Sequence, residues 1–280
     1  MPTHGRSLTL ARSLTLALLL RGGTATAATA AAMSSSAPSS VKRTIAAPPL
    51  VAAGGAPWPF TERELRRRDE SADAAFYSQP RFVHHIDDGC IGSLRDNVYG
   101  RLFEEGDDVL DVCSSWVSHF PDGVDLGAVV GVGMNALELE RNPRLTSHVV
   151  QDLNHDLVLP FDDGSFDKVT NAVSVDYLAK PQVMFQEFHR VLRPGGMAIM
   201  AWSNRMFPTK VVGIWLTLSE EQRVQHVMTY FLTCGAEFMD VRGYEISTSE
   251  RDPLYVVTGR RPLSTPLSES EGRDGFSSSL

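Results

Sequence analysis

Residues 159–169 read LPFDDGSFDKV, and they mark the clearest transition from loop to strand in the chain. Residues 160–164 have the composition of a turn, whereas residues 166–173 form an apolar run with the length of a buried strand. Farther along, residues 190–196 read RVLRPGG, and this use of Pro and Gly is typical of a helix end that precedes a strand. The two segments predict a strand and a helix that lead directly into a second strand.

Strands and helices alternate over the rest of this region, and the short apolar runs predict buried parallel strands. The predicted strands cover residues 108–112, 128–132, 147–150, 166–173, 197–202, 238–246 and 254–258, and the predicted helices cover residues 135–141, 181–192, 208–218 and 220–234. We therefore predict an α/β fold: a Rossmann-like, doubly wound, seven-stranded sheet that is mostly parallel and ends in a C-terminal antiparallel hairpin.

The two ends of the chain differ from its middle in composition. The first acidic residue is Glu62, whereas five Lys and Arg residues precede it among Ala, Ser, Thr, Leu and Pro, as in targeting peptides. We predict that residues 1–60 are an organelle targeting peptide and a linker, so that folded structure begins near residue 61. Residues 61–106 are predicted to be an N-terminal helical segment, residues 107–261 the α/β domain, and residues 262–280 a disordered tail.

The predicted leader is compatible with more than one destination. Arg-flanked leucines followed by Ala25, Thr26 and Ala27 resemble a secretory signal, whereas the Ser-rich, acid-poor remainder resembles a transit peptide. A plastid is the first choice, a mitochondrion the second and secretion the third. Met33 is an alternative start, and the apolar run at residues 13–20 is shorter than the roughly 20 residues that cross a bilayer.

Charge and cysteine content argue against several functional classes. Removing the five early cations from the 26 Lys and Arg residues leaves 21 against 34 acidic residues, a net charge of about −13 that disfavours nucleic-acid binding. Cys90, Cys113 and Cys234 form no C-x-x-C pair, so neither a disulfide framework nor a zinc site is expected. The neighbouring His84 and His85 point to opposite sides of an extended chain, and no metal site is expected there.

The segments at residues 159–169 and 190–196 closely resemble two signatures of the class I S-adenosylmethionine-dependent methyltransferases, in particular the type 11, UbiE-like group. The resemblance covers the central half of the chain and implies S-adenosylmethionine as the cofactor. Both signatures are architectural. The candidate binding residues are therefore those that follow each strand, because ligands of doubly wound sheets bind beyond the carboxyl ends of the strands.

The first strand end departs from the family pattern. Asp111 keeps the acid that the family has there, and it is interpreted as a contact to the ligand amine or to water, or as an exposed strand end. Cys113, Ser115 and Val117 stand where the family has glycines. Their side chains occupy space that the methionine moiety of the cofactor would need. Cys113 and Ser114 are the candidate cofactor-binding residues of this turn.

The next two strand ends carry the nucleoside contacts that the resemblance implies. Gly133 stands where the family has an acid that binds both ribose hydroxyls. Asn135 or Glu138 is the candidate replacement, although Asn135 is equally suited to be a plain helix N-cap. Asp152 and Leu153 match the adenine site, where the carboxylate accepts a hydrogen bond from the adenine amino group and the next backbone N–H reaches the ring.

The fourth strand end supplies Asn171, Ser174 and Asp176 as candidates near the sulfonium. Methyl transfer is an in-line displacement that alignment promotes, so a dedicated base is not required. If a proton has to leave the acceptor, Asp176 or Tyr177 is the candidate catalytic base. Residues 76–82, which are rich in aromatic side chains, are expected either to form a lid over the site or to close the edge of the sheet.

Two functions are consistent with these patterns. The first is a methyltransferase that acts on a small-molecule acceptor in an organelle. The alternative is a catalytically inactive methyltransferase-like binding or assembly factor, which the altered glycines and the missing ribose acid favour. A nicotinamide-dependent reductase is disfavoured because nothing after Val112 supplies a GxGxxG turn for the pyrophosphate.

Overall fold

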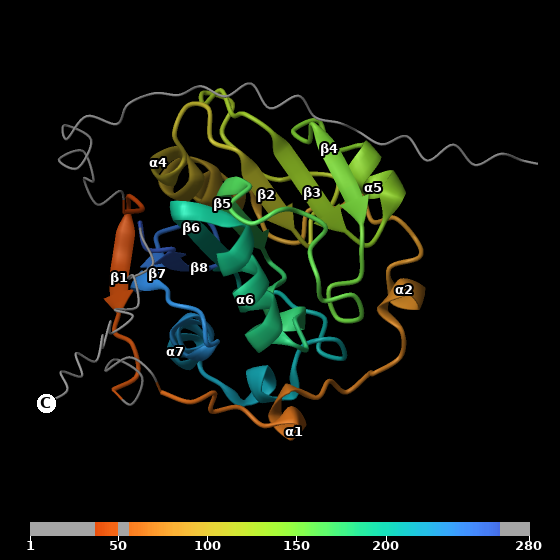
Figure 1. The fold of residues 1–280 in the computed structure, drawn as a ribbon, viewed down its shortest axis with the longest axis vertical. Coiled ribbons are helices and arrows are strands. Elements are labelled where there is room, and N and C mark those ends of the chain that lie inside the picture. Colours follow the sequence, from red (N-terminus) through yellow and green to blue (C-terminus); the bar gives the residue numbers. More distant parts are fainter. Residues whose placement is uncertain (1–36, 50–55, 264–280) are drawn as a thin grey trace, which may run out of the picture. The chain divides into compact units, whose positions relative to one another are not determined.

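A computed structural model describes residues 37–49 and 56–263, which are built around one eight-stranded sheet (Figure 1). The strand order is β1-β7-β8-β6-β5-β2-β3-β4. The strands are β1 (Val41–Ile45), β2 (Val109–Val112), β3 (Val129–Gly133), β4 (Ser147–Val150), β5 (Phe166–Ala172), β6 (Leu192–Trp202), β7 (Met239–Ile246) and β8 (Leu254–Arg260). Strands β2 to β6 pair in parallel, whereas β8 is antiparallel to both β6 and β7. The predicted Rossmann-like fold class is confirmed, with eight strands in place of seven.

The helical elements connect these strands and cover both faces of the sheet. They are α1 (Glu62–Leu65), α2 (Asp73–Phe76), α3 (Asp88–Ser93), the π-helix η2 (Leu94–Tyr99), α4 (Gly100–Leu102), α5 (Ala136–Glu140), the 3₁₀ helix η3 (Val175–Tyr177), α6 (Pro181–Val191), the 3₁₀ helix η4 (Gly213–Thr217) and α7 (Glu220–Thr233). Within the predicted N-terminal helical segment, residues 61–106, the longest helical run is the continuous one from α3 through η2 to α4.

Strand β6 shows how the sheet separates two hydrophobic cores. Met200 and Trp202 pack with residues of α6 and α7, which lie in front of the sheet in Figure 1. Ile199 and Ala201 pack with residues of α3, η2 and α4 in the second core. Successive side chains of a strand point to opposite faces, so a continuous apolar run is what a strand covered on both faces requires.

The two signature segments hold each other in place. Arg190 at the end of α6 donates to the carbonyl oxygens of Leu159 and Phe161, at 2.9 and 2.7 Å. Arg193 forms an ion pair with Asp167 at the start of β5. Arginine is suited to this arrangement because its fixed fork reaches several oxygens at once. The architectural role predicted for both segments is therefore confirmed.

The prediction that folded structure begins near residue 61 is wrong. Strand β1 pairs antiparallel with β7, and Val41 lies opposite Ile246 at the edge of the sheet. Only Ile45 of this strand is buried, and its neighbours are exposed. The strand was missed because it contributes one core residue within a segment of linker-like composition. Most of the predicted leader and linker, residues 1–60, and of the predicted tail, residues 262–280, lies outside the described residues: 1–36, 50–55 and 264–280 are not described.

The first part of the predicted N-terminal helical segment, residues 61–72, and the helix predicted over residues 208–218 are mostly irregular and contain only α1 and η4. Some of their charged residues, among them Arg67 and Lys210, form tertiary ion pairs with Asp73. Lys210 is 1% exposed, and its Nζ lies 3.1 Å from carboxylate oxygens of both Asp69 and Asp73. None of the helices in the described part of the chain has the length and apolar character that a membrane crossing requires.

We predict that Ile45→Ala lowers the free energy of unfolding by about 2–4 kcal/mol, because it removes the buried side chain by which β1 joins the core. The matched control is Val41→Ala on the same strand, where the side chain is 38% exposed. Chemical denaturation of the two variants measures the difference. Equal losses would contradict the packing of β1 on the sheet.

Candidate functional site

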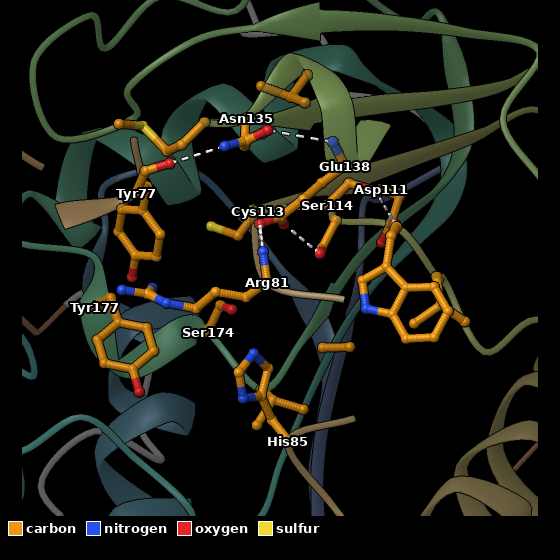
Figure 2. A pocket seen from close by; sticks show the side chains of 18 of the residues that line it. Tyr77, Arg81, His85, Asp111, Cys113, Ser114, Asn135, Glu138, Ser174 and Tyr177 are labelled. Carbon is orange, nitrogen blue, oxygen red and sulfur yellow. Dashed lines mark hydrogen bonds between the residues drawn. The ribbon is translucent and has the colours of Figure 1, made fainter. Parts of the chain in front are cut away.

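A cavity of about 260 Å³ lies beyond the carboxyl ends of β2, β3, β4 and β5. It is covered by residues 73–87, here called the strap. Tyr77, Arg81 and His85 of the strap line the cavity (Figure 2), and so does His84. Residues 76–82 thus contribute to the cavity wall, and the lid over the site stays a prediction.

The structure brings most of the predicted site residues together. Those that line the cavity are Asp111, Cys113, Ser114, Gly133, Asn135, Asp152, Leu153, Ser174 and Tyr177. Asn171 and Asp176 are also close to this region but are buried beneath it, and neither lines the cavity.

The turn after β2 keeps a glycine-like backbone without a glycine. Cys113 has a φ of 55°, in the left-handed region where a side chain costs about 1–2 kcal/mol. Its side chain lines the cavity. The pKa of the thiol is raised to about 12, mainly by burial and to a smaller extent by repulsion from Asp111. The turn therefore retains the conformation that the family glycine provides, while a neutral thiol fills part of the space.

Asp111 is held by internal partners. Its carboxylate accepts hydrogen bonds from the hydroxyls of Ser114, Ser118 and Thr170, at 2.7, 2.8 and 2.9 Å. Burial raises the pKa of this carboxyl to about 6, and the three hydroxyls oppose that rise. Asp111 is 3% exposed, so the alternative of an exposed strand end is wrong. Its structural role is to fix the turn that follows β2.

Gly133 at the end of β3 has no room for a side chain. A Cβ on this residue would overlap the backbone carbonyl oxygen of Ser114. The Ser114 N–H donates to the carbonyl oxygen of Val132 at 2.8 Å, which holds the turn against β3. An acidic side chain at residue 133 would require the whole turn to move. The altered glycine turn and the missing ribose acid are therefore parts of one rearrangement.

Asn135 is the N-cap of α5. Its Oδ1 accepts from the backbone N–H groups of Leu137 and Glu138, at 3.1 and 3.2 Å, and its Nδ2 donates to the carbonyl oxygen of Tyr77 at 3.0 Å. The capping interpretation is therefore the one that the structure supports. Glu138 also lies at the cavity, where it accepts from the Ser115 hydroxyl at 2.5 Å (Figure 2).

The loop after β4 presents groups with unused hydrogen-bonding capacity. Oδ1 of Asp152 accepts from the backbone N–H of Asn154 at 2.9 Å. Within the described residues, neither Oδ2 of Asp152 nor the backbone N–H of Leu153 has a hydrogen-bond partner. One acceptor and one donor are thus adjacent at the cavity wall, which is the pair that an adenine edge requires.

The end of β5 differs from the expectation. The Asn171 side chain donates to the carbonyl oxygen of Val112 at 3.4 Å and lies under the turn at Cys113. Burial raises the pKa of Asp176 to about 7, but its carboxyl belongs to the layer below the cavity. Tyr177 does line the cavity, and its hydroxyl accepts from the backbone N–H of Phe207 at 2.8 Å.

Several cavity residues were not assigned a role from the sequence. Trp116 stacks on His84 with 5.1 Å between ring centroids, and Phe207 lies 5.6 Å from the ring of His85. Phe207 follows β6 in an irregular loop and belongs to no motif, so only its position in space identifies it. No group of three or more His, Cys, Asp or Glu residues is arranged to hold a metal ion in the described ranges.

Residues 119–200 match the family model described as a methyltransferase domain. The match begins just after the altered turn, and it includes Gly133, Asp152 and the first signature segment. The resemblance to the type 11 group of S-adenosylmethionine-dependent methyltransferases is therefore confirmed for this part of the chain.

Curated relatives are similar over part of their length. The demethylmenaquinone methyltransferase of Staphylococcus epidermidis is 35% identical over 107 residues, which are 34% of this chain and 43% of the relative. Methyltransferase GfsG of Streptomyces halstedii is 29% identical over 153 residues, 49% of this chain and 54% of the relative. The chain thus spans about half the length of these relatives.

Among solved structures, a putative methyltransferase in complex with the Trm112 methyltransferase activator of Haloferax volcanii has a TM-score of 0.44 and 18% sequence identity. The alignment covers 60% of this chain and 87% of that chain.

We predict that Gly133→Ala lowers the free energy of unfolding by about 1–3 kcal/mol, because the new methyl group meets the Ser114 carbonyl. The control is Gly92→Ala in α3, where a Cβ has no neighbour within 4 Å and alanine favours the helix. Thermal unfolding of the two variants tests the difference. A Gly133→Ala variant as stable as the native chain would show that the turn is free to move.

Proposed function

We propose that this chain, which carries a methyltransferase domain of the type 11 group, transfers a methyl group from S-adenosylmethionine to a small-molecule acceptor in an organelle. The observation that carries the proposal is the cavity at the strand ends, where Asp152 and Leu153 present an acceptor and a neighbouring donor to which no other described residue hydrogen-bonds. The family and its relatives support the same chemistry. The Staphylococcus epidermidis relative is named a demethylmenaquinone methyltransferase, and this name supports an acceptor of low molecular mass.

The residues of the cavity fit the nucleoside end of the cofactor. Oδ2 of Asp152 accepts from the adenine amino group in this proposal, and the Leu153 N–H donates to the ring. Glu138 takes part of the role of the ribose acid, because its carboxylate already lies at the cavity and each oxygen has a further lone pair. The rearranged turn leaves less room beside Cys113 for the amino-acid end.

The cofactor supplies a sulfonium-bound methyl group, and the chain supplies alignment and exclusion of water. Tyr77 and Tyr177 line the cavity from the strap and from η3, so that aromatic surface is present on both sides. Asp176 lies outside the cavity in this structure, so the proposed reaction uses it as neither a direct base nor a ligand contact. The Tyr177 hydroxyl accepts a hydrogen bond from the backbone N–H of Phe207, and it remains the candidate for a hydrogen bond to the methyl acceptor.

A second function is favoured by the turn at Cys113 and Ser114. The side chain of Cys113 fills space that a glycine leaves open, and the Ser114 carbonyl closes the position of the ribose acid. A chain of this kind could keep the fold as an inactive binding or assembly factor. Binding of the cofactor without methyl transfer, or no binding at all, would support this alternative.

We predict that Asp152→Ala weakens the binding of S-adenosylmethionine and S-adenosylhomocysteine by about 1–3 kcal/mol, because it leaves the adenine amino group without its acceptor. The control is Asp156→Ala in the same loop, where the side chain is exposed and does not line the cavity. Calorimetric titration of the chain that begins at residue 37 measures both. Unchanged affinity in Asp152→Ala would place the nucleoside elsewhere, and no binding by the native chain at millimolar ligand would contradict the enzyme.

The proposed location is a plastid, with a mitochondrion as the alternative, because the first acidic residue is Glu62 and the preceding stretch is rich in Ser and Ala. Since β1 begins at Val41, we propose that cleavage occurs before this strand.

We expect residues 1–36, fused to a fluorescent protein, to direct it to plastids when it is expressed in plant cells. Microscopy against plastid and mitochondrial markers decides between the two organelles. A fusion of residues 37–60 serves as the control and should stay diffuse. Diffuse fluorescence from both fusions would contradict the targeting role.

A further inference from the structure

Arg81 enters the cavity from the strap and carries a charge that has no acidic partner. Its backbone N–H donates to Oε1 of Glu138 at 2.7 Å, and its Nη2 donates to the carbonyl oxygen of Phe76 at 2.9 Å. Arg67, Arg190 and Arg205 each pair with a carboxylate, whereas the guanidinium of Arg81 has no such partner within the described ranges.

Aromatic rings hold the guanidinium of Arg81 in a fixed orientation. Its central carbon lies 4.4 Å from the ring centroid of Phe76, 5.6 Å from that of Tyr77 and 5.3 Å from that of Phe207. Figure 2 shows the side chain running across the pocket toward Tyr77 and Tyr177. Nε and Nη1 have no protein partner among the residues that the structure describes, and neither is a buried atom. These donors remain accessible to a ligand.

None of the described acids that line the cavity forms an ion pair with the Arg81 guanidinium. Asp73 pairs with Arg67 at 2.6 Å and with Lys210 at 3.1 Å. Asp111 accepts from three hydroxyls, and Asp152 lies in a tight turn. Arg81 therefore contributes a positive charge to the cavity wall that no described carboxylate pairs with directly, since Glu138 accepts only from its backbone N–H. Such a charge attracts an anion.

We propose that Arg81 recognises a carboxylate of a ligand bound in this cavity. A guanidinium with accessible N–H donors on Nε and Nη1 donates charge-assisted hydrogen bonds to a carboxylate, and stacking on aromatic rings lowers the entropy lost on binding. The proposal rests on the proposed function for its setting. The carboxylate belongs either to the amino-acid end of the cofactor or to an acidic acceptor, and binding measurements separate the two sources.

The first measurement concerns the cofactor end. The native chain and Arg81→Met are titrated with S-adenosylhomocysteine and with 5′-methylthioadenosine, which has the same nucleoside and a thioether but no amino-acid end. If the carboxylate is that of the cofactor, the preference for S-adenosylhomocysteine falls by about tenfold or more in Arg81→Met, because a charge-assisted pair is lost. The affinity for 5′-methylthioadenosine stays the same.

The second measurement concerns an acidic acceptor. Benzoate and benzamide, which differ in charge but little in shape, are titrated by NMR into the chain with and without saturating S-adenosylhomocysteine. If Arg81 binds the acceptor, the native chain prefers benzoate and Arg81→Met loses that preference. Loss of preference in either measurement supports the proposal and identifies the source of the carboxylate. Unchanged preferences in both measurements overturn it.

Two further variants separate recognition from folding. Arg81→Lys keeps the positive charge but not the planar guanidinium, and it should retain part of the preference that Arg81→Met loses. Arg141→Met removes a comparable stacked guanidinium, 4.2 Å from the ring of Phe82, at a position that does not line the cavity, and it should leave both preferences unchanged. If the native chain binds neither nucleoside, the proposed function fails, and the benzoate titration without nucleoside still tests Arg81.

Discussion

The ion cluster at Asp73 holds the strap in place over the cavity. The buried carboxylate of Asp73 pairs with Arg67 and Lys210, and it also accepts from Nδ2 of Asn154 at 2.9 Å. The same Nδ2 donates to the carbonyl oxygen of Tyr177. Loss of one member of such a cluster leaves an uncompensated buried charge, which costs about 3–5 kcal/mol. The cluster joins the strap to the loop after β4 and to the segment after β6, and the position of every strap residue in the cavity depends on it.

Beneath the strap, the shape of the site depends on how closely the turn after β2 approaches the end of β3. The Ser114 carbonyl occupies the space that a side chain on residue 133 would need, so a glycine there is required by packing. Cys113 meanwhile adopts the left-handed backbone that a glycine usually provides. A reversion of residue 133 alone to the acid of the family pattern would therefore meet the Ser114 carbonyl.

Most of the fold could be predicted from the sequence because its strands are apolar runs between strong turn residues. The exception, β1, buries one side chain and so leaves almost no hydrophobic pattern to detect. In the site, Asp111, Cys113 and Asp152 were placed correctly at the cavity because parallel strands end on one edge. Asn171 and Asp176 do not line the cavity as predicted, because some residues at the end of β5 point into the buried layer beneath it. Arg81 and Phe207 are far apart in sequence and come into contact only in the folded chain, so no local sequence pattern predicts their contact.

The pairing of Val41 with Ile246 also constrains when this molecule becomes complete. The two residues are separated by almost the whole described chain, and contacts of that sequence separation carry a large loop-closure cost and form slowly. The first strand in sequence is therefore expected to be among the last to dock during synthesis, once β7 and β8 exist. Until then, the outer edge of β7 is open to pairing with other chains.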